Sequence, residues 1–384
     1  MAKLGEICTV VSGSTPKTSV ASYWDGSIKW ITPAELNNES FYITDSVRHI
    51  TEEGKEKTGL SSFPAGTVIL SSRAPIGKTA IAGCEMCCNQ GFKNLICSEK
   101  IYNEYLYFFL KSKTNYLNSL GRGATFKEIS KTIVENIEVP LPDINQQKGI
   151  AEKFKKLEEL ISLRKQQLAK LDELVKARFV EMFGDAKLNP YDFPCNSLSE
   201  YILFLTSGSR GWSRYFTDSG EYFITIKNVK NCRITLQDVQ YVTPPDNAEA
   251  KRTKVQENDL LISITADLGR TGVVTKGIAE HGAYINQHLT CIRLNLKKAN
   301  PIYVAYYMES DAGKEQFASK NQSAVKAGLN FNAINSLKLV VPPLDLQNDF
   351  AAFVECVDQQ KQTIQQSLDK LELMKKALMQ EYFG

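Results

Sequence analysis

The chain has 384 residues, of which 43% are hydrophobic and 23% charged, and its formal net charge at pH 7 is +3. This length predicts two or three domains, and this balance is typical of a soluble globular protein rather than a collagen-like, disordered or mucin-like one. No apolar run reaches the roughly 18 residues that a membrane span requires, and the N-terminus lacks the apolar core of a signal peptide, so we expect a cytoplasmic protein without a membrane partner.

The first half of the sequence predicts short strands followed by helices. The segment 67–71 is typical of a buried strand, and it is followed by a turn that contains Gly77. The apolar segment 102–113 predicts a helix. Pro140 and Pro142 should stop the next strand and mark the exit to a long helix.

The second half predicts the same elements in the same order. The segment 260–264 is typical of a buried strand and precedes a turn at Gly269, and the segment 301–309 predicts an apolar helix. Pro342 and Pro343 take the place of the earlier proline pair. The two halves therefore look like copies of one unit.

Matching residues support this duplication. Glu181-Met182-Phe183-Gly184 resembles Glu381-Tyr382-Phe383-Gly384, which lies 200 residues further on. At the same offset Gln147 meets Gln347. Further upstream, at a slightly smaller offset, Asn89-Gln90 has a counterpart in Asn286-Gln287. An internal repeat defines the architecture before any motif does. We expect two similar globular domains, 1–142 (the first domain) and 185–343 (the second domain), each followed by a helical spacer, 143–184 and 344–384.

Each spacer carries a hydrophobic seam at alternating steps of three and four residues, which is typical of a coiled coil. At about 1.5 Å per residue, a helix of roughly 40 residues is on the order of 60 Å long. The fold class is therefore α/β (α+β), with two mixed domains and two long helices that share one hydrophobic seam. The seam residues are Ile150, Phe154, Leu157, Ile161, Leu168, Leu171 and Val175 in the first helix, and Phe350, Val354, Val357, Ile364, Leu368, Leu371 and Leu378 in the second.

No motif for catalysis stands out. Ile76-Gly77-Lys78-Thr79 resembles the end of a P-loop, but Ser72 occupies the place of its first glycine. The sequence Cys84-x-x-Cys87 lacks the second ligand pair that a zinc site needs. Three histidines do not form a repeated catalytic arrangement with serine or cysteine. We expect neither an enzyme nor a metal site in this chain.

Two similar but diverged domains on a helical spacer would suit a split DNA target with two different half-sites. Arginine and lysine pair with guanine or phosphate, and asparagine and glutamine pair with adenine. The candidates are Lys17, Arg73, Lys78, Asn89, Gln90, Lys93, Arg122 and Lys127 in the first domain, and Arg210, Trp212, Arg214, Arg270, Asn286, Gln287, His288 and Lys326 in the second.

A structural role is the main alternative for several of these residues. Single surface cations are commonly solvated without function. The Asn-Gln pair recurs in both domains, which favours a shared structural role such as capping, because a contact that discriminates half-sites should differ between the domains. Unmatched cations such as Arg122 and Arg214 are better candidates for sequence reading.

The ordered, duplicated motifs resemble the specificity subunits of type I restriction-modification systems over essentially the whole chain. They comprise Leu4-Gly5-Glu6-Ile7, Ser12-Gly13-Ser14-Thr15-Pro16 and Trp30-Ile31, together with the glycine turns and Asn-Gln pairs. The most specific is a proline-rich exit followed by a glutamine and a heptad helix, at 140–150 and 342–350.

The resemblance implies two target-recognition domains that bind one split sequence in double-stranded DNA. It also implies that the two helices form an antiparallel coiled coil of pseudo-two-fold symmetry and set the gap. It implies two partner methyltransferase subunits, which use S-adenosylmethionine to methylate adenine at N6, and motor-nuclease restriction subunits, which use ATP and Mg²⁺. No cofactor is expected in this chain. Two alternatives remain open: a stand-alone DNA-binding regulator, and a protein-interaction scaffold whose loops bind peptide or carbohydrate.

Overall fold

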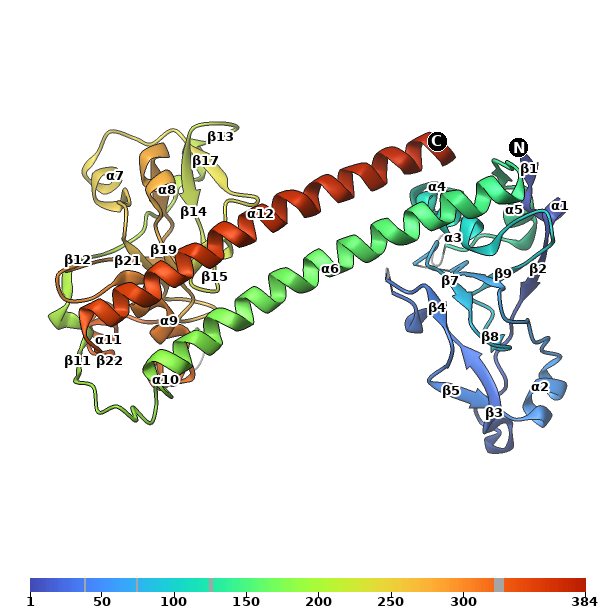
Figure 1. The fold of residues 1–384 in the computed structure, drawn as a ribbon, viewed down its shortest axis with the longest axis horizontal. Helices are drawn as coiled ribbons and strands as arrows, with labels where there is room; N and C mark the ends of the chain where they lie inside the picture. Colours follow the sequence, from blue (N-terminus) through green and yellow to red (C-terminus); the bar gives the residue numbers. More distant parts are fainter. Residues whose placement is uncertain (38, 74, 124–126, 321–327) are drawn as a thin grey trace. The chain divides into compact units, whose positions relative to one another are not determined.

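The computed structural model describes residues 1–37, 39–73, 75–123, 127–320 and 328–384 (Figure 1). The chain has the predicted mixed α/β architecture, with two long helices that pack together. The helices are α6 (Ile144–Phe183) and α12 (Leu344–Phe383), each of 40 residues. In the described part of the chain, no helix is long and apolar enough to cross a membrane.

The first domain is built on a five-stranded sheet in the order β2-β9-β6-β7-β4, beside a three-stranded sheet, β5-β3-β8. Its elements are β1 (Ala2–Lys3), α1 (Leu4–Ile7), β2 (Cys8–Ser12), β3 (Trp24–Ile31), β4 (Tyr42–Ile43), β5 (Arg48–Ile50), α2 (Glu52–Thr58), β6 (Val68–Leu70), β7 (Thr79–Ala82), β8 (Cys87–Cys88), β9 (Lys93–Cys97), α3 (Asn103–Ser112), α4 (Thr114–Leu120), α5 (Lys131–Glu135) and β10 (Glu138–Val139). The predicted strand at 67–71 is β6, and the predicted helix at 102–113 is α3.

The second domain has two four-stranded sheets, β12-β21-β18-β19 and β13-β17-β14-β20. Its elements are β11 (Cys195–Ser197), β12 (Ile202–Ser207), β13 (Phe216–Thr217), β14 (Glu221–Ile224), β15 (Val229–Lys230), β16 (Arg233–Ile234), β17 (Gln240–Val242), α7 (Ala248–Thr253), β18 (Leu260–Ser263), β19 (Thr271–Val273), α8 (Lys276–His281), β20 (Ala283–Ile285), β21 (Leu289–Leu294), α9 (Pro301–Glu309), α10 (Asp311–Ser319), α11 (Phe331–Asn335) and β22 (Lys338–Val340). The predicted strand is β18, and the predicted helix at 301–309 is α9.

The chain forms two compact units that differ from the two sequence repeats. One unit contains Met1–Gln166 and Gln365–Gly384, and the other contains Gln167–Ile364. Each long helix therefore contributes one half to each unit. The first domain packs with the start of α6 and the end of α12, and the second domain packs with the end of α6 and the start of α12.

Aromatic residues at the helix ends explain this division. Phe383, at the end of α12, is 2% exposed and its ring lies 5.3 Å from Tyr105 and 5.6 Å from Phe154, measured between centroids. In the other unit, Phe183 at the end of α6 is 4% exposed, and its ring lies 4.7 Å from Tyr303 and 5.5 Å from Phe350. The repeated Phe-Gly ending thus completes a domain core in each unit.

A repeated buried glutamine fixes the start of each helix to its domain. The Gln147 side-chain oxygen accepts a hydrogen bond from the Tyr102 backbone at 2.8 Å, and its nitrogen donates to the Lys100 and Pro142 carbonyls. Gln347 likewise accepts from the Asn300 backbone at 2.9 Å and donates to the Pro342 carbonyl. Both glutamines are 0% exposed. Because a buried amide must be hydrogen-bonded, this matched arrangement accounts for the repetition of the residue.

The helix contacts within each unit run antiparallel. In the unit of the first domain, Lys153 donates to the Tyr382 hydroxyl at 2.9 Å, and Lys165 lies 3.8 Å from Glu372. Residues further along α6 therefore contact residues that come earlier in α12. In the unit of the second domain, Lys361 and Asp172 lie 2.6 Å apart.

Each of the expected seam residues is buried or half-buried. The buried ones are Phe154, Leu157, Ile161, Val175, Phe350, Val354, Val357 and Leu368, and the half-buried ones are Ile150, Leu168, Leu171, Ile364, Leu371 and Leu378. Several of them pack into a domain rather than only against the other helix: Phe154 and Leu378 join the core of the first domain, and Val175 and Phe350 join that of the second.

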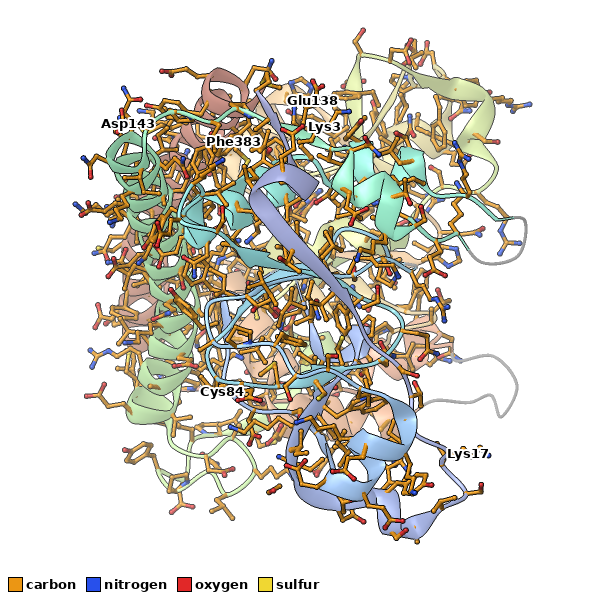
Figure 2. All side chains as sticks on the ribbon, turned by 90° about the vertical axis from the view of Figure 1, so that its right-hand side faces the viewer. Lys3, Lys17, Cys84, Glu138, Asp143 and Phe383 are labelled. Atoms are coloured by element: carbon orange, nitrogen blue, oxygen red, sulfur yellow. The ribbon has the colours of Figure 1, made fainter. Side chains whose placement is uncertain are left out.

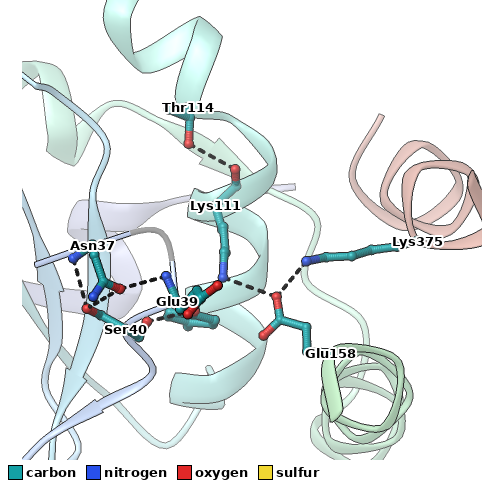
Figure 3. Close-up of polar contacts among 8 residues, drawn as sticks. Asn37, Glu39, Ser40, Lys111, Thr114, Glu158 and Lys375 are labelled. Carbon is teal, nitrogen blue, oxygen red and sulfur yellow. Dashed lines mark hydrogen bonds and ion pairs between the residues drawn. The ribbon is translucent and has the colours of Figure 1, made fainter. Parts of the chain in front are cut away.

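An ion-pair cluster joins α3, α6 and α12 in the unit of the first domain (Figure 3). Glu158 on α6 lies 3.1 Å from the Lys111 ammonium and 2.6 Å from the Lys375 ammonium. The Lys111 ammonium also donates to the Tyr107 hydroxyl at 2.8 Å. Burial by itself would raise the pKa of Glu158, but the two lysines outweigh it and hold that pKa below its ordinary value. We call these residues the Glu158 cluster.

We expect Glu158→Gln to destabilise this unit by about 3 kcal/mol at pH 7, because Lys111 and Lys375 would remain largely buried without their counter-charge. A carboxyl whose pKa is lowered on folding stabilises the fold above its unfolded pKa of about 4.3 and loses this effect as the pH falls through its folded pKa. Urea unfolding should therefore separate wild type from Glu158→Gln at pH 7, and the difference should shrink as the pH falls below the unfolded pKa toward the lowered folded pKa of Glu158. The control is Glu159→Gln, an exposed neighbour on α6. A pH-independent difference would contradict the ionic explanation.

The unit of the second domain holds its helices with different residues. Arg233 of β16 lies 2.6 Å from Asp358 on α12 and 3.5 Å from Asp172 on α6. Although burial opposes the charged form, the bond to Asp358 and the two carboxylates raise the pKa of the guanidinium. Acidic residues on the helices thus contact basic residues on the domain in both units.

Candidate nucleic-acid interface

The sheet topology gathers the candidate residues of the first domain at one end. Strands β2 and β6 end where β7 and β9 begin, because β9 pairs antiparallel with β2 and with β6, and β7 pairs antiparallel with β6. The loop residues 13–17, 71–73, 75–78 and 89–92 therefore lie on the same side of the sheet. Figure 2 shows Lys17 at this end of the domain, with Lys3 and Glu138 at the opposite end. We call this side the loop end of the first domain.

The second domain has an equivalent loop end. Strands β12 and β18 end where β19 and β21 begin, through antiparallel pairing of β18 with β19 and of β21 with β12 and β18. The loops at 208–214, 264–270 and 286–288 therefore leave on one side. Each domain thus collects its candidate residues from segments far apart in the sequence. Lys326 lies outside the described residues.

A repeated glycine lets the first of these loops approach the Asn-Gln loop closely. A Cβ atom on Gly13 would lie 1.9 Å from the Cys88 carbonyl oxygen, and one on Gly208 would lie 2.1 Å from the Asn286 carbonyl oxygen. Any side chain would therefore push the two loops apart. This contact is the physical reason for the repeated Ser-Gly before the loop.

The repeated asparagines have the structural role that their recurrence favours. The Asn89 side-chain oxygen accepts from the Gly91 backbone at 2.9 Å, and that of Asn286 accepts from the His288 backbone at 3.2 Å. A side-chain bond to the backbone two residues further on is an Asx turn, which fixes the loop. Gln90 and Gln287 instead point their side chains toward the first loop of their own domain.

Several predicted cations have partners within the protein. Arg73 and Lys93 share Glu128, at 2.9 and 3.2 Å. Burial would raise the pKa of Glu128, but these two cations outweigh it and lower that pKa. The Lys78 ammonium donates to the Pro33 and Leu36 carbonyls, at 3.2 and 2.6 Å. In the second domain Arg270 donates to Asp267 at 2.5 Å. These residues shape the loop ends: Glu128 offsets part of the charge of Arg73 and Lys93, Asp267 pairs with Arg270, and Lys78 is held by neutral carbonyls.

Other predicted cations are free to meet a ligand. Lys17, Arg122 and Lys127 are exposed, and their side chains have no hydrogen bond or ion pair with any described residue. The backbone of Arg122 is nevertheless fixed, since it exchanges two hydrogen bonds with Glu128. In the second domain the exposed Arg214 guanidinium lies 4.8 Å from the Tyr215 ring centroid. These four side chains are the cations best placed for phosphate or base contacts.

Two candidates of the second domain have internal roles. The Trp212 ring is 3% exposed and packs against Phe223 and Tyr284, and its nitrogen donates to Glu249 at 3.2 Å. It cannot stack on a base while it forms this core. The His288 ring lies 2.6 Å from the Thr265 hydroxyl through Nδ1, which leaves Nε2 at the loop end.

Within the described residues, no three side chains of His, Cys, Asp or Glu form a group that could hold a metal. Cys87 and Cys88 lie buried in β8, and burial raises the pKa of both thiols. The positive φ of Gly77 (90°) belongs to a tight turn between β6 and β7. The loop ends expose polar and cationic side chains.

Two related domains that present different side chains from equivalent loops define a protein with a bipartite binding surface. A sequence model of the type I restriction modification DNA specificity domain matches residues 1–173 and 214–373. These residues cover most of the chain and fall in both domains. The chain therefore belongs to the family of type I restriction-modification specificity subunits, and the resemblance found in the sequence is confirmed.

Individual relatives agree with this family. The chain is 39% identical over 186 residues to the specificity subunit of the type I restriction enzyme MjaIX from Methanocaldococcus jannaschii, an alignment that covers 48% of this chain and 43% of that subunit. It thus spans less than half of that relative. The S subunit structure from M. genitalium matches with a TM-score of 0.57 at 16% identity, over 100% of this chain and 95% of that one. A chain from a structural study of type I R-M complex assembly matches with a TM-score of 0.61 at 17% identity, over 100% and 96%.

These comparisons confirm the fold class, and they place the chain among subunits that are named for specificity and are not catalytic. The sequence prediction of a chain without its own catalytic activity therefore agrees with its family. The individual reading residues remain predictions.

Proposed function

We propose that this chain is the DNA sequence-specificity subunit of a type I restriction-modification complex and that it binds a split target in double-stranded DNA. The observation that carries the proposal is the pair of equivalent loop ends. They share the glycine contact and the Asx turn but carry different exposed side chains, Lys17 and Arg122 in one and Arg214 in the other. A shared framework with different contact residues suits two half-sites of different sequence.

Membership of the specificity-subunit family supports the view that other subunits carry out methylation and DNA cleavage. We propose that two methyltransferase subunits and, where present, restriction subunits bind this chain, and that S-adenosylmethionine, ATP and Mg²⁺ bind to those partners. Methylation of a base inside a duplex requires that the base is turned out into an active site, which the partner would provide. In this division of labour the chain selects the site and positions the methyltransferase.

A genome-wide map of N6-methyladenine tests this function. The map is made in cells that express the methyltransferase partner with and without this chain. A split motif that appears only with the chain would establish specificity and report both half-sites and the gap. If no new motif appears, a pull-down for the methyltransferase separates a wrong partner from a wrong function. Binding to DNA with high affinity in the absence of any partner would favour the stand-alone regulator instead.

We expect Arg122→Ala to weaken recognition of half-site one alone. Its side chain is exposed while its backbone is held by Glu128, so truncation should leave the fold intact and remove about 1–3 kcal/mol of contact with DNA. Duplexes with a substituted half-site one or half-site two, titrated with the methyltransferase complex, measure the effect. Lys131→Ala, at an exposed lysine of the same domain that is not among the candidate reading residues, is the control. Equal loss at both half-sites, or none, would remove Arg122 from the reading residues.

A further inference from the structure

The first loop of each domain holds the repeated glutamine by its side-chain oxygen. In the first domain the Thr15 hydroxyl donates to the Gln90 side-chain oxygen at 2.5 Å. In the second domain the Arg210 guanidinium donates through Nε to the Gln287 side-chain oxygen. Thr15 and Arg210 occupy equivalent positions, each two residues after the close-packed glycine. The same acceptor is therefore held from the same place by two different donors.

The backbones of the two loops are fixed around this contact. The Ser14 backbone nitrogen donates to the Cys88 carbonyl at 3.0 Å. In the second domain the Gln287 backbone nitrogen donates to the Ser209 carbonyl at 2.9 Å, and the Ser209 backbone nitrogen donates to the Ile285 carbonyl at 2.8 Å. Because the backbone positions match, the difference between the domains lies in the donor side chain.

A hydroxyl and a guanidinium constrain an amide differently. The Thr15 hydroxyl both donates and accepts, so Gln90 can turn over its amide and keep a bond to Thr15 through either the oxygen or the nitrogen. An arginine only donates, so Gln287 must keep its oxygen on Arg210. The side-chain nitrogen of Gln287 also lies 3.4 Å from Nε2 of His288, which can accept a hydrogen bond from it when that ring nitrogen carries no proton. The Gln287 amide is thus fixed with its nitrogen turned away from Arg210, whereas the Gln90 amide can adopt either orientation.

We propose that Thr15 and Arg210 are positioning residues that decide which hydrogen-bonding groups of Gln90 and Gln287 meet the DNA. Because Thr15 accepts as well as donates, Gln90 can present either its nitrogen or its oxygen to a base, and such a donor and acceptor match the N7 and N6 groups of adenine. Gln287 keeps its oxygen on Arg210 and so turns its amide nitrogen, a donor, toward acceptors such as N7 and O6 of guanine. This inference rests on the proposed function and assigns a specificity-determining position to each half-site.

The test exchanges the two donors. Thr15→Arg should make the first domain resemble the second, and Arg210→Thr should do the reverse. Each variant, as the full chain with the methyltransferase partner, is assayed by methylation of duplex libraries in which one half-site is randomised and the other is kept. Thr15→Arg should lower methylation of duplexes with a donor-bearing base at one position of half-site one by about tenfold relative to acceptor-only bases. Preference in half-site two should not change.

Three controls make the result specific. Thr15→Ser keeps the hydroxyl and should keep the wild-type preference. In a Gln90→Ala background, Thr15→Arg should cause no further change of preference, because the positioning residue acts through the glutamine. Arg210→Thr should broaden the preference at one position of half-site two and leave half-site one unchanged.

Unchanged base preference in both exchanged variants, with the wild-type motif methylated normally, would overturn the proposal. So would a preference change that persists in the Gln90→Ala background. The proposed function fails in a different way, since the wild-type chain would then direct no methylation to any split motif.

Discussion

Phe383→Ala is expected to lower the free energy of unfolding of the unit that contains the first domain by about 3–5 kcal/mol, the usual cost of removing a buried phenylalanine ring. The ring is 2% exposed and lies against Tyr105, Phe109 and Phe154. Its loss leaves a cavity in the domain core and also frees the end of α12. The effect should therefore be larger than that of losing a contact between the two helices alone.

Hydrogen exchange followed by mass spectrometry localises this effect. Phe383→Ala should speed exchange of α3 in the first domain and leave α9 in the second domain near its wild-type rate. Phe183→Ala should do the opposite, because its ring lies against Tyr303 of α9. Leu373→Ala, at a side chain that is 68% exposed on α12, is the control and should cost less than about 0.5 kcal/mol. Equal exchange changes in both domains would contradict the division into two units.

The sequence predicted the elements whose signal is local. The apolar run of α9 and its N-terminal proline gave a helix over the observed residues, Pro301–Glu309. The heptad pattern identified the buried face of both long helices. The same pattern did not include Phe183 and Phe383, and it could not show that their rings enter a domain core. Their ring partners, such as Tyr303 and Tyr105, lie more than 100 positions away in sequence. The repeated Phe-Gly ending was the available signal.

The candidate interface was predicted in part. Residue types and repeat positions identified loops that the sheets do bring to one end of each domain. The net charge that those loops expose was not predictable, because Arg73 and Lys93 share Glu128, which lies 55 and 35 residues away in sequence. Trp212 was expected among the binding residues, but it lies in a short 3-10 turn whose sequence has no periodicity to indicate its buried side. Likewise, only the folded structure shows that Thr15 and Arg210 donate to Gln90 and Gln287, because each donor lies more than 70 residues from its acceptor in sequence.

Insertion of one heptad into both long helices is expected to abolish methylation at the original gap. The insertions go between Gln166 and Gln167 in α6 and between Ile364 and Gln365 in α12, where the two compact units divide. Seven residues keep the hydrophobic seam in phase and lengthen each helix by about 10.5 Å. This length corresponds to about three base pairs of B-DNA. Methylation at the original gap should fall at least tenfold, which corresponds to a loss of about 1.4 kcal/mol or more in binding free energy.

The new gap should be about three base pairs longer and less efficiently methylated than the original one. Three base pairs also turn a half-site by nearly a third of a helical turn around the DNA, which a heptad insertion does not compensate. Duplexes that hold both half-sites constant and vary only the gap measure this response. A three-residue insertion at the same places is the control, because it shifts the seam out of phase and should lower the stability of the helix pair. If the heptad variant kept the original gap, the helices could not be the element that sets it, and the spacing would have to come from the partner subunits.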